Sequence, residues 1–324
     1  MSRIIYVPLE HIDGRYTVHM DRDIMEYFVN NDIEFIKIMP DLQAAPLPEG
    51  CFLNAAFTSK FKANQLMMIA DLYEQDLIRD DDRFFFSDIW FPGIESIAYM
   101  NYFHKKTAKI TGIIHAGSFT DTDFVRDLER WAKNFEDIVF DISDTIYCAS
   151  NFIRDDIIQK RMVDPSKFVV SGLPVDYETL GCYASRKADR VIFNGRICDE
   201  KQPHLFDKLE QRVKEVMGRT DIEFVKTQDL GLNKDQYYQL LAESKCVVSY
   251  ALQENFGFGI AEAAYLGCTP VLPNRLVYPE LYDEKYLFDT HEESVIMVCD
   301  ALQQQYQDSV ELNCDPLATW FGQR

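Results

Sequence analysis

Short apolar runs alternate with longer segments of helical spacing, and this rhythm constrains the fold more than any other feature of the chain. In the first half, β-branched and aromatic runs predict strands at residues 4–8, 33–38, 84–86, 110–114 and 145–149. Helices are expected between them, one starting at Thr17 or Asp21 and others over about 93–103 and 125–135. Such alternation predicts a parallel sheet with helices on both faces.

The same rhythm restarts in the second half of the chain. Further strands are expected at 168–170, 190–193, 222–226, 246–250 and 269–272, with helices at about 203–216, 234–243 and 261–266. A turn-rich connection at 172–176 and a weakly patterned linker at 177–188 separate the two series. With 324 residues there is enough chain for two cores, so we expect two α/β domains, 1–172 and 173–314.

The charge balance argues against tight, non-specific binding of a nucleic acid and leaves room only for a small local basic patch. The formal net charge is −20, both halves are acidic, and the densest basic cluster is Lys105-Lys106 with Lys109 nearby. We see no apolar run long enough to span a bilayer and no signal peptide, and the eight scattered cysteines suggest neither disulfides nor a zinc site. These features predict a cytoplasmic protein.

The most informative stretch runs from residue 250 to residue 271. A predicted strand ends there, a loop with Gly257 and Gly259 carries Glu254, and the following helix carries Glu262 eight residues later. Free N–H groups at a helix start bind phosphate, and carboxylates accept hydrogen bonds from sugar hydroxyls. Taken alone, the pair is better explained by a helix cap and an ordinary surface glutamate than by a ligand site.

A second block makes a phosphate site more specific. Gly195-Arg196 follows the predicted strand at 190–193, and Lys201 lies five residues beyond the arginine, where the next helix begins. Two cations at such a place would neutralise a diphosphate leaving group without a metal ion. A third block covers 149–176.

Together the blocks 149–176, 193–201 and 254–262 resemble the retaining GT-B-fold glycosyltransferases of glycosyltransferase family four. The N-terminal half is more faintly similar to glycosyltransferases of large bacteriophages, in the loop 10–15 and at 115–123. The resemblance implies two doubly wound Rossmann-like domains facing each other across a cleft, with the segment 315–324 packing back toward the N-terminal domain. It also implies retaining transfer of a hexose or pentose from a nucleotide-diphosphate sugar to a hydroxyl acceptor, with no cofactor and no metal.

The resemblance also assigns roles to individual residues. Arg196 and Lys201 would hold the diphosphate, and Glu262 the ribose. Glu254 would face the hydroxyls of the transferred sugar, and His115 would face the sugar from the N-terminal domain. Backbone N–H groups around Phe256, Gly257 and Phe258 would assist.

The acceptor is less well defined by the sequence. Asp88 and Trp90 follow a predicted strand, at the edge where α/β sheets bind ligands, and Gly14 and Arg15 lie in the phage-like loop. Asp121 and Asp123 form a D-x-D, which we interpret as first-turn residues of a helix and not as metal ligands.

Two alternatives stay open. One is the same transfer to a hydroxymethylated base of phage DNA, which would need a basic strip on one face made of Lys60, Lys62, Lys105, Lys106 and Lys109. The other is a non-catalytic protein that only binds a nucleotide sugar.

Overall fold

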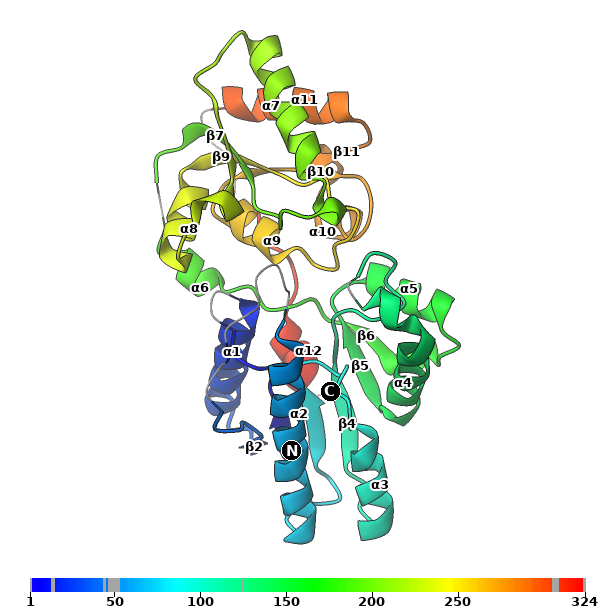
Figure 1. The fold of residues 1–324 in the computed structure, drawn as a ribbon. Coiled ribbons are helices and arrows are strands. Elements are labelled where there is room, and N and C mark those ends of the chain that lie inside the picture. The colour runs from blue at the N-terminus through cyan, green and yellow to red at the C-terminus, as the bar shows by residue number, and fades with distance from the viewer. Residues whose placement is uncertain are drawn as a thin grey trace. The chain divides into compact units, whose positions relative to one another are not determined.

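The computed structural model describes residues 2–12, 15–42, 45, 53–123, 125–183, 185–304 and 309–322. The chain forms two compact units, and Figure 1 labels their helices and strands. One unit comprises Met1–Gly172 with Asp315–Arg324, and the other comprises Leu173–Cys314. Among the described residues, no helix is long and apolar enough to cross a membrane.

The N-terminal unit is built on a six-stranded parallel sheet. Its strands lie in the order β2-β1-β3-β4-β5-β6. Their bounds are Ile4–Val7 (β1), Phe35–Lys37 (β2), Arg83–Phe86 (β3), Lys109–Ile114 (β4), Thr145–Cys148 (β5) and Phe168–Val170 (β6). The strand order reverses between β1 and β3, so the loops after these strands diverge at a topological switch point, where ligands bind in open α/β sheets.

Helices cover both faces of this sheet, and strand β3 shows why. Phe85 points to one face, where its ring lies 5.4 Å from Trp320 and 4.6 Å from Phe321. Phe84 and Phe86 point to the other face, because successive strand side chains alternate. All three rings are fully buried, which only a sheet covered on both sides allows.

The covering helices follow this division. Helices α1 (Tyr16–Asn30) and α12 (Pro316–Phe321) meet on the Phe85 face, with Phe28 and Phe321 4.7 Å apart. The core on the Phe84 face is completed by residues of α2 (Ala55–Glu74), α3 (Glu95–His104), α4 (Glu129–Ile142) and α5 (Asn151–Lys160).

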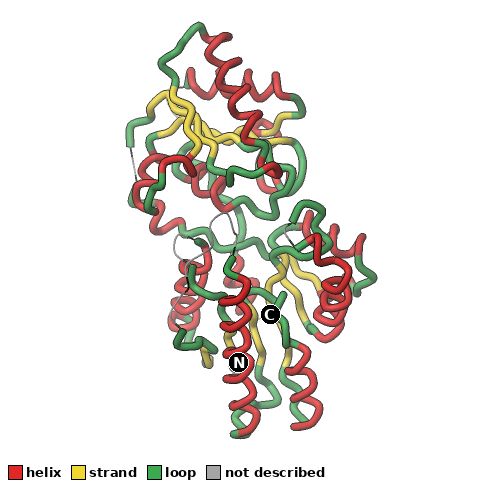
Figure 2. The backbone as a smooth tube through the Cα atoms, in the orientation of Figure 1, coloured by secondary structure: helices red, strands yellow, loops and turns green. Residues whose placement is uncertain are grey.

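The C-terminal unit has a five-stranded parallel sheet in the order β11-β10-β9-β7-β8. The strands are Ala188–Phe193 (β7), Glu223–Lys226 (β8), Ser244–Val248 (β9), Thr269–Pro273 (β10) and Leu287–Phe288 (β11). The helices are Tyr177–Leu180 (α6), Pro203–Met217 (α7), Lys234–Ala242 (α8), Phe258–Tyr265 (α9), Tyr278–Leu281 (α10) and His291–Gln303 (α11). Figure 2 shows the strands as a middle layer with helices on either side. Here the order reverses between β7 and β9, so this switch point brings together the two loops that carry the sequence blocks.

Most predicted strands and helices lie where the sequence places them, with three notable differences. The long helix α2 and helices α5 and α11 were not predicted. The expected linker at 177–188 contains the short helix α6.

The reading of Asp121 and Asp123 as first-turn helix residues is wrong, because the 3-10 turn that precedes α4 begins only at Arg126. Asp121 instead pairs with Lys160 of α5 at 3.1 Å, and Asp123 Oδ1 accepts a hydrogen bond from the N–H of Val125 at 3.0 Å within the loop.

Candidate functional site

The loop after β9 presents Glu254 at the start of α9. Gly257 is the N-cap of this helix, and its φ of +83° lies in the left-handed region that favours glycine. Glu254 Oε1 accepts a hydrogen bond from the N–H of Asn255 at 3.2 Å. The carboxylate is thereby held beside the helix start, a quarter exposed.

The loop after β7 brings Lys201 to the same place. Its ammonium lies 3.2 Å from Glu254 Oε2 and also donates to the carbonyl oxygen of Gln253. A second tie joins the two loops, because Asn194 Nδ2 donates to the Gly259 carbonyl at 2.5 Å. A Cβ on Gly259 would lie only 2.9 Å from that same Nδ2, so a larger residue would displace the Asn194 amide.

A small cavity of about 60 Å³ lies between these loops. Its lining includes Lys201, Glu254, Gly257 and two residues that the sequence reasoning missed, Ser249 and Tyr278. The hydroxyls of these two lie 2.8 Å apart, and burial raises the pKa of Tyr278. Ser249 borders the glutamate block and could have been suspected there, whereas Tyr278 comes from α10 and carries no local signal.

Arg196 lies apart from this cavity. Its guanidinium pairs with Glu200 at 2.5 Å, the side chain is half exposed, and among the described residues it does not belong to the cavity lining. The expected convergence of Arg196 and Lys201 is therefore not seen in this structure. Phe256 is buried and its ring packs on Phe258 at 5.0 Å, so these two residues offer backbone groups rather than side chains.

Glu262 lies on the buried side of α9, with 6% of its surface exposed. Its Oε1 accepts hydrogen bonds from Lys234 Nζ at 2.8 Å and from the Tyr238 hydroxyl at 3.0 Å. Both partners come from α8, and the sequence reasoning named neither. Lys234 also lies over the Tyr238 ring, 4.5 Å from its centroid, which holds the cation in place.

In the N-terminal unit, His115 directly follows β4. Its Nε2 lies 2.7 Å from the carbonyl oxygen of Ser87, and its ring lies 5.5 Å from that of Tyr16. Burial lowers the pKa of His115, so the imidazole is neutral at pH 7. Because a carbonyl only accepts, Nε2 carries the proton and Nδ1 the lone pair.

The predicted acceptor residues have their own contacts. Asp88 Oδ2 lies 3.7 Å from Lys62 Nζ, and the indole Nε1 of Trp90 donates to Glu136 Oε1 at 3.2 Å. Arg15 is the N-cap of α1, while Gly14 lies outside the described residues.

The lysines proposed for a DNA-binding strip are partly engaged in ion pairs. Lys62 has only 12% of its side chain exposed and pairs with Asp88. Lys106 pairs with Asp76 at 2.7 Å, which also lowers the pKa of that carboxyl. These pairs reduce the positive charge that the strip could offer to a phosphate backbone.

Comparison with solved structures identifies the architecture. HepE from Anabaena, in complex with UDP, superposes with a TM-score of 0.58 over 94% of this chain and 91% of its own, at 13% identity. Sucrose-phosphate synthase from Thermosynechococcus elongatus gives 0.63 over 94% and 90%, at 9% identity. The chain has the GT-B fold. The predicted fold class of two Rossmann-like domains is thereby confirmed.

Other comparisons are more partial. TarM from S. aureus, in complex with UDP among other ligands, matches 75% of this chain with a TM-score of 0.52 and 15% identity, and the match spans about half of TarM, 52%. A tRNA-queuosine alpha-mannosyltransferase from Drosophila melanogaster is 34% identical over 101 residues, which are 31% of this chain and 25% of the relative. No protein-family model matches the chain.

Proposed function

We propose that this chain is a retaining glycosyltransferase that moves a sugar from a nucleoside-diphosphate donor to a hydroxyl acceptor. The observation that carries the proposal is the Lys201–Glu254 pair beside the glycine-lined cavity at the β7/β9 switch point. The cavity brings together a cation and a helix start, which suit the departing diphosphate of such a donor, and a carboxylate, which suits the hydroxyls of its sugar. The GT-B fold and the UDP bound in HepE and TarM support the same reading.

Each residue then has a distinct task. Lys201 neutralises the charge that develops as the diphosphate leaves, and the N–H groups at the start of α9 assist, without a metal ion. Glu254 accepts hydrogen bonds from hydroxyls of the transferred sugar, and Glu262 from the ribose. Arg196, which is half exposed, swings from Glu200 to the diphosphate when the donor binds.

His115 contributes a neutral imidazole toward the transferred sugar. Because burial lowers its pKa, it adds a polar contact without adding positive charge near the diphosphate. The acceptor hydroxyl attacks on the face from which the diphosphate departs and gives its proton to an oxygen of the departing phosphate, so no enzymic nucleophile is required.

A ligand screen followed by product analysis tests the proposal. We expect a UDP- or GDP-sugar, and the matching nucleoside diphosphate, to raise the melting temperature, because a ligand at 100 times its dissociation constant adds about 2.7 kcal/mol. The proton NMR spectrum of the product should show the anomeric configuration of the donor. Absence of binding by every nucleoside diphosphate would refute the donor site, an inverted product would refute retention alone, and binding without turnover would favour the non-catalytic alternative.

For the acceptor, we propose a hydroxyl on a modified nucleoside in RNA. The support is the similarity to the tRNA-queuosine alpha-mannosyltransferase, which is named for such an acceptor. The hydroxymethylated DNA base is the competing acceptor. Incubation with the active donor and either queuosine-containing tRNA, the same tRNA lacking queuosine, or hydroxymethylated DNA separates the two. Transfer to the DNA alone would refute the RNA acceptor.

A further inference from the structure

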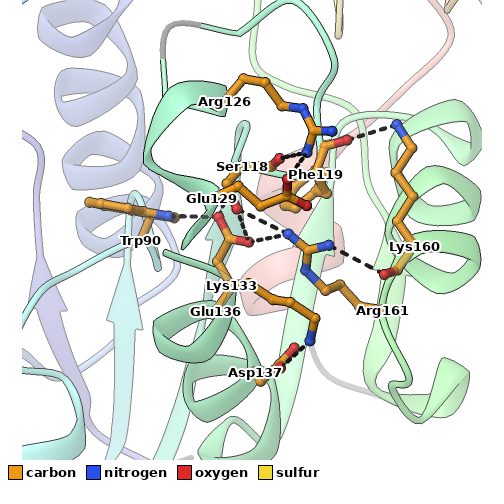
Figure 3. Close-up of polar contacts among 10 residues, drawn as sticks. All are labelled: Trp90, Ser118, Phe119, Arg126, Glu129, Lys133, Glu136, Asp137, Lys160 and Arg161. Atoms are coloured by element: carbon orange, nitrogen blue, oxygen red, sulfur yellow. Dashed lines mark hydrogen bonds and ion pairs between the residues drawn. The ribbon is translucent and has the colours of Figure 1, made fainter. Parts of the chain in front are cut away.

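A buried ion pair lies behind the loop that carries His115. Glu136 of α4 and Arg161, the C-cap of α5, are 1% and 4% exposed, and their side chains lie 2.9 Å apart. A buried pair of this kind is weak as a source of stability, because desolvation offsets the attraction between the charges. What it does supply is a set of hydrogen bonds with fixed directions, and Figure 3 shows where these lead.

The bonds of Glu136 lead to two different loops. Oε1 accepts from the backbone N–H of Ser118 at 2.6 Å and from the indole of Trp90 at 3.2 Å. Oε2 accepts from the Ser118 hydroxyl at 2.8 Å. Ser118 belongs to the loop after β4 and Trp90 to the loop after β3, so one carboxylate connects both loops at the carboxyl edge of the sheet.

Arg161 fixes the carboxylate and the loop together. Its Nη2 donates to Glu136 Oε2 and, at 3.0 Å, to the Ser118 hydroxyl. Two further cations hold backbone oxygens of the same loop, Arg126 on Ser118 at 3.0 Å and Lys160 on Phe119 at 2.7 Å.

The local sequence is adapted to this contact. A Cβ on Gly117 would lie 2.7 Å from Glu136 Oε1 and 2.4 Å from the Phe119 ring. Glycine is therefore the one residue that lets the carboxylate reach the backbone of the loop. The segment from His115 to Phe119 is held against α4 by this close approach.

We propose that Glu136, whose buried charge Arg161 offsets, is a positioning residue that fixes the His115 loop relative to the Trp90 loop. The inference rests on the proposed function insofar as His115 and Trp90 contact substrates. Glu136 itself is buried. It acts through the acceptor oxygen that it presents to Ser118 and Trp90.

Two double variants isolate that oxygen. Both Glu136→Gln/Arg161→Met and Glu136→Leu/Arg161→Met remove the ion pair, but only the glutamine retains an oxygen for Ser118 and Trp90. Arg3→Met/Asp82→Leu is the matched control, because it removes another buried pair of the same unit, 2.7 Å long with side chains 8% and 0% exposed. That pair joins the amino ends of β1 and β3 and lies away from both loops.

Hydrogen exchange and the His115 titration are measured first, since neither depends on catalysis. In the leucine double variant, we expect faster amide exchange across 115–120 and a His115 pKa, followed by NMR, that moves back toward 6.5 as the ring becomes hydrated. Asp88 and the Ser87 carbonyl raise the pKa of His115, and Lys62 lowers it. The neutral Tyr16 ring packs against the imidazole. All four groups are unchanged in the variants. The glutamine double variant and the control should keep wild-type exchange and the wild-type pKa.

Turnover is measured next. A displaced group at a reacting centre lowers the rate by about 10- to 100-fold, so we expect kcat to fall to that extent in the leucine double variant alone, with unchanged affinity for the nucleoside diphosphate. Wild-type exchange, pKa and kcat in a folded leucine variant would overturn the proposal, and so would equal losses in both double variants. If the leucine variant does not fold, Ser118→Ala/Trp90→Phe replaces it, because it removes both side-chain donors to Glu136, and unchanged exchange there would overturn the proposal. Should the wild type transfer no sugar at all, the proposed function fails, while exchange and titration still decide the positioning role.

Discussion

Replacing Lys201 by methionine tests the donor site most directly. The Lys201 side chain is 13% exposed, and among the described residues its ammonium directs two of its three N–H groups at Glu254 and at the Gln253 carbonyl. The third is available to an oxygen of the diphosphate. A charge-assisted hydrogen bond contributes about 1.5–3 kcal/mol, so Lys201→Met should weaken binding of the nucleoside diphosphate by about 10- to 150-fold.

Lys245→Met is the matched control. Lys245 also has 13% exposure, pairs with Asp189 at 2.8 Å and donates to the carbonyl oxygen of Leu302 at 2.7 Å. It lies at the start of β9, whereas Lys201 approaches the loop at the end of that strand. Both variants lose an ion pair and a hydrogen bond to a carbonyl, so their unfolding free energies should fall by similar amounts.

Isothermal calorimetry with the nucleoside diphosphate that stabilises the wild type measures the difference. The expected result is a large loss of affinity for Lys201→Met and wild-type affinity for Lys245→Met. Equal affinities in the two folded variants would refute the assignment of Lys201 to the diphosphate. Equal losses in both would show that the effect comes from destabilisation of the unit.

Three further predictions concern the same groups. Glu254→Gln should lower turnover with little change in affinity for the free nucleoside diphosphate. Glu262→Gln should instead weaken the binding of both the free nucleoside diphosphate and the intact donor. Identical losses of affinity for both ligands in both variants, measured by calorimetry, would contradict this division. Gly257→Ala should lower the unfolding free energy by about 1–3 kcal/mol, because position 257 has a left-handed backbone, and it should also weaken donor binding. Gly231→Ala is the control, since Gly231 has a φ of +57° and no atom lies within 4 Å of the new Cβ, and it should lower stability alone. Denaturant titration measures stability and calorimetry measures binding. Because the pKa of His115 is below the ordinary value of 6.5, the unfolded chain takes up that proton first as the pH falls, so stability decreases below about pH 6.5. His115→Gln should make this decrease shallower in melts recorded between pH 7 and 5, and an unchanged slope would argue against a buried neutral imidazole.

Local patterns were sufficient where an element is buried on both faces or has clear start and stop residues. The run Phe84-Phe85-Phe86 predicts a strand by composition alone, and its burial on both faces agrees with a parallel sheet. Helix α7 was predicted nearly to its observed bounds, because Pro203 begins it and Gly218 ends it in a left-handed conformation. The twenty-residue helix α2 was missed. Only four of its residues are buried, Phe61, Gln65, Ile69 and Tyr73, at an i, i+4 spacing that includes a glutamine.

The residues of the proposed donor site could be selected from the sequence by itself, because they stand in two short blocks that each follow a strand. That Lys201 and Glu254 meet was decided by the strand order, which puts β7 beside β9 although the two residues are 53 positions apart in the sequence. Contact partners that come from other elements could not be predicted from the sequence. They include Tyr278 for the cavity, Lys234 for Glu262 and Glu136 for the His115 loop. A buried carboxylate such as Glu136 looks like any polar helix residue in sequence, since only the packed structure shows which donors it satisfies.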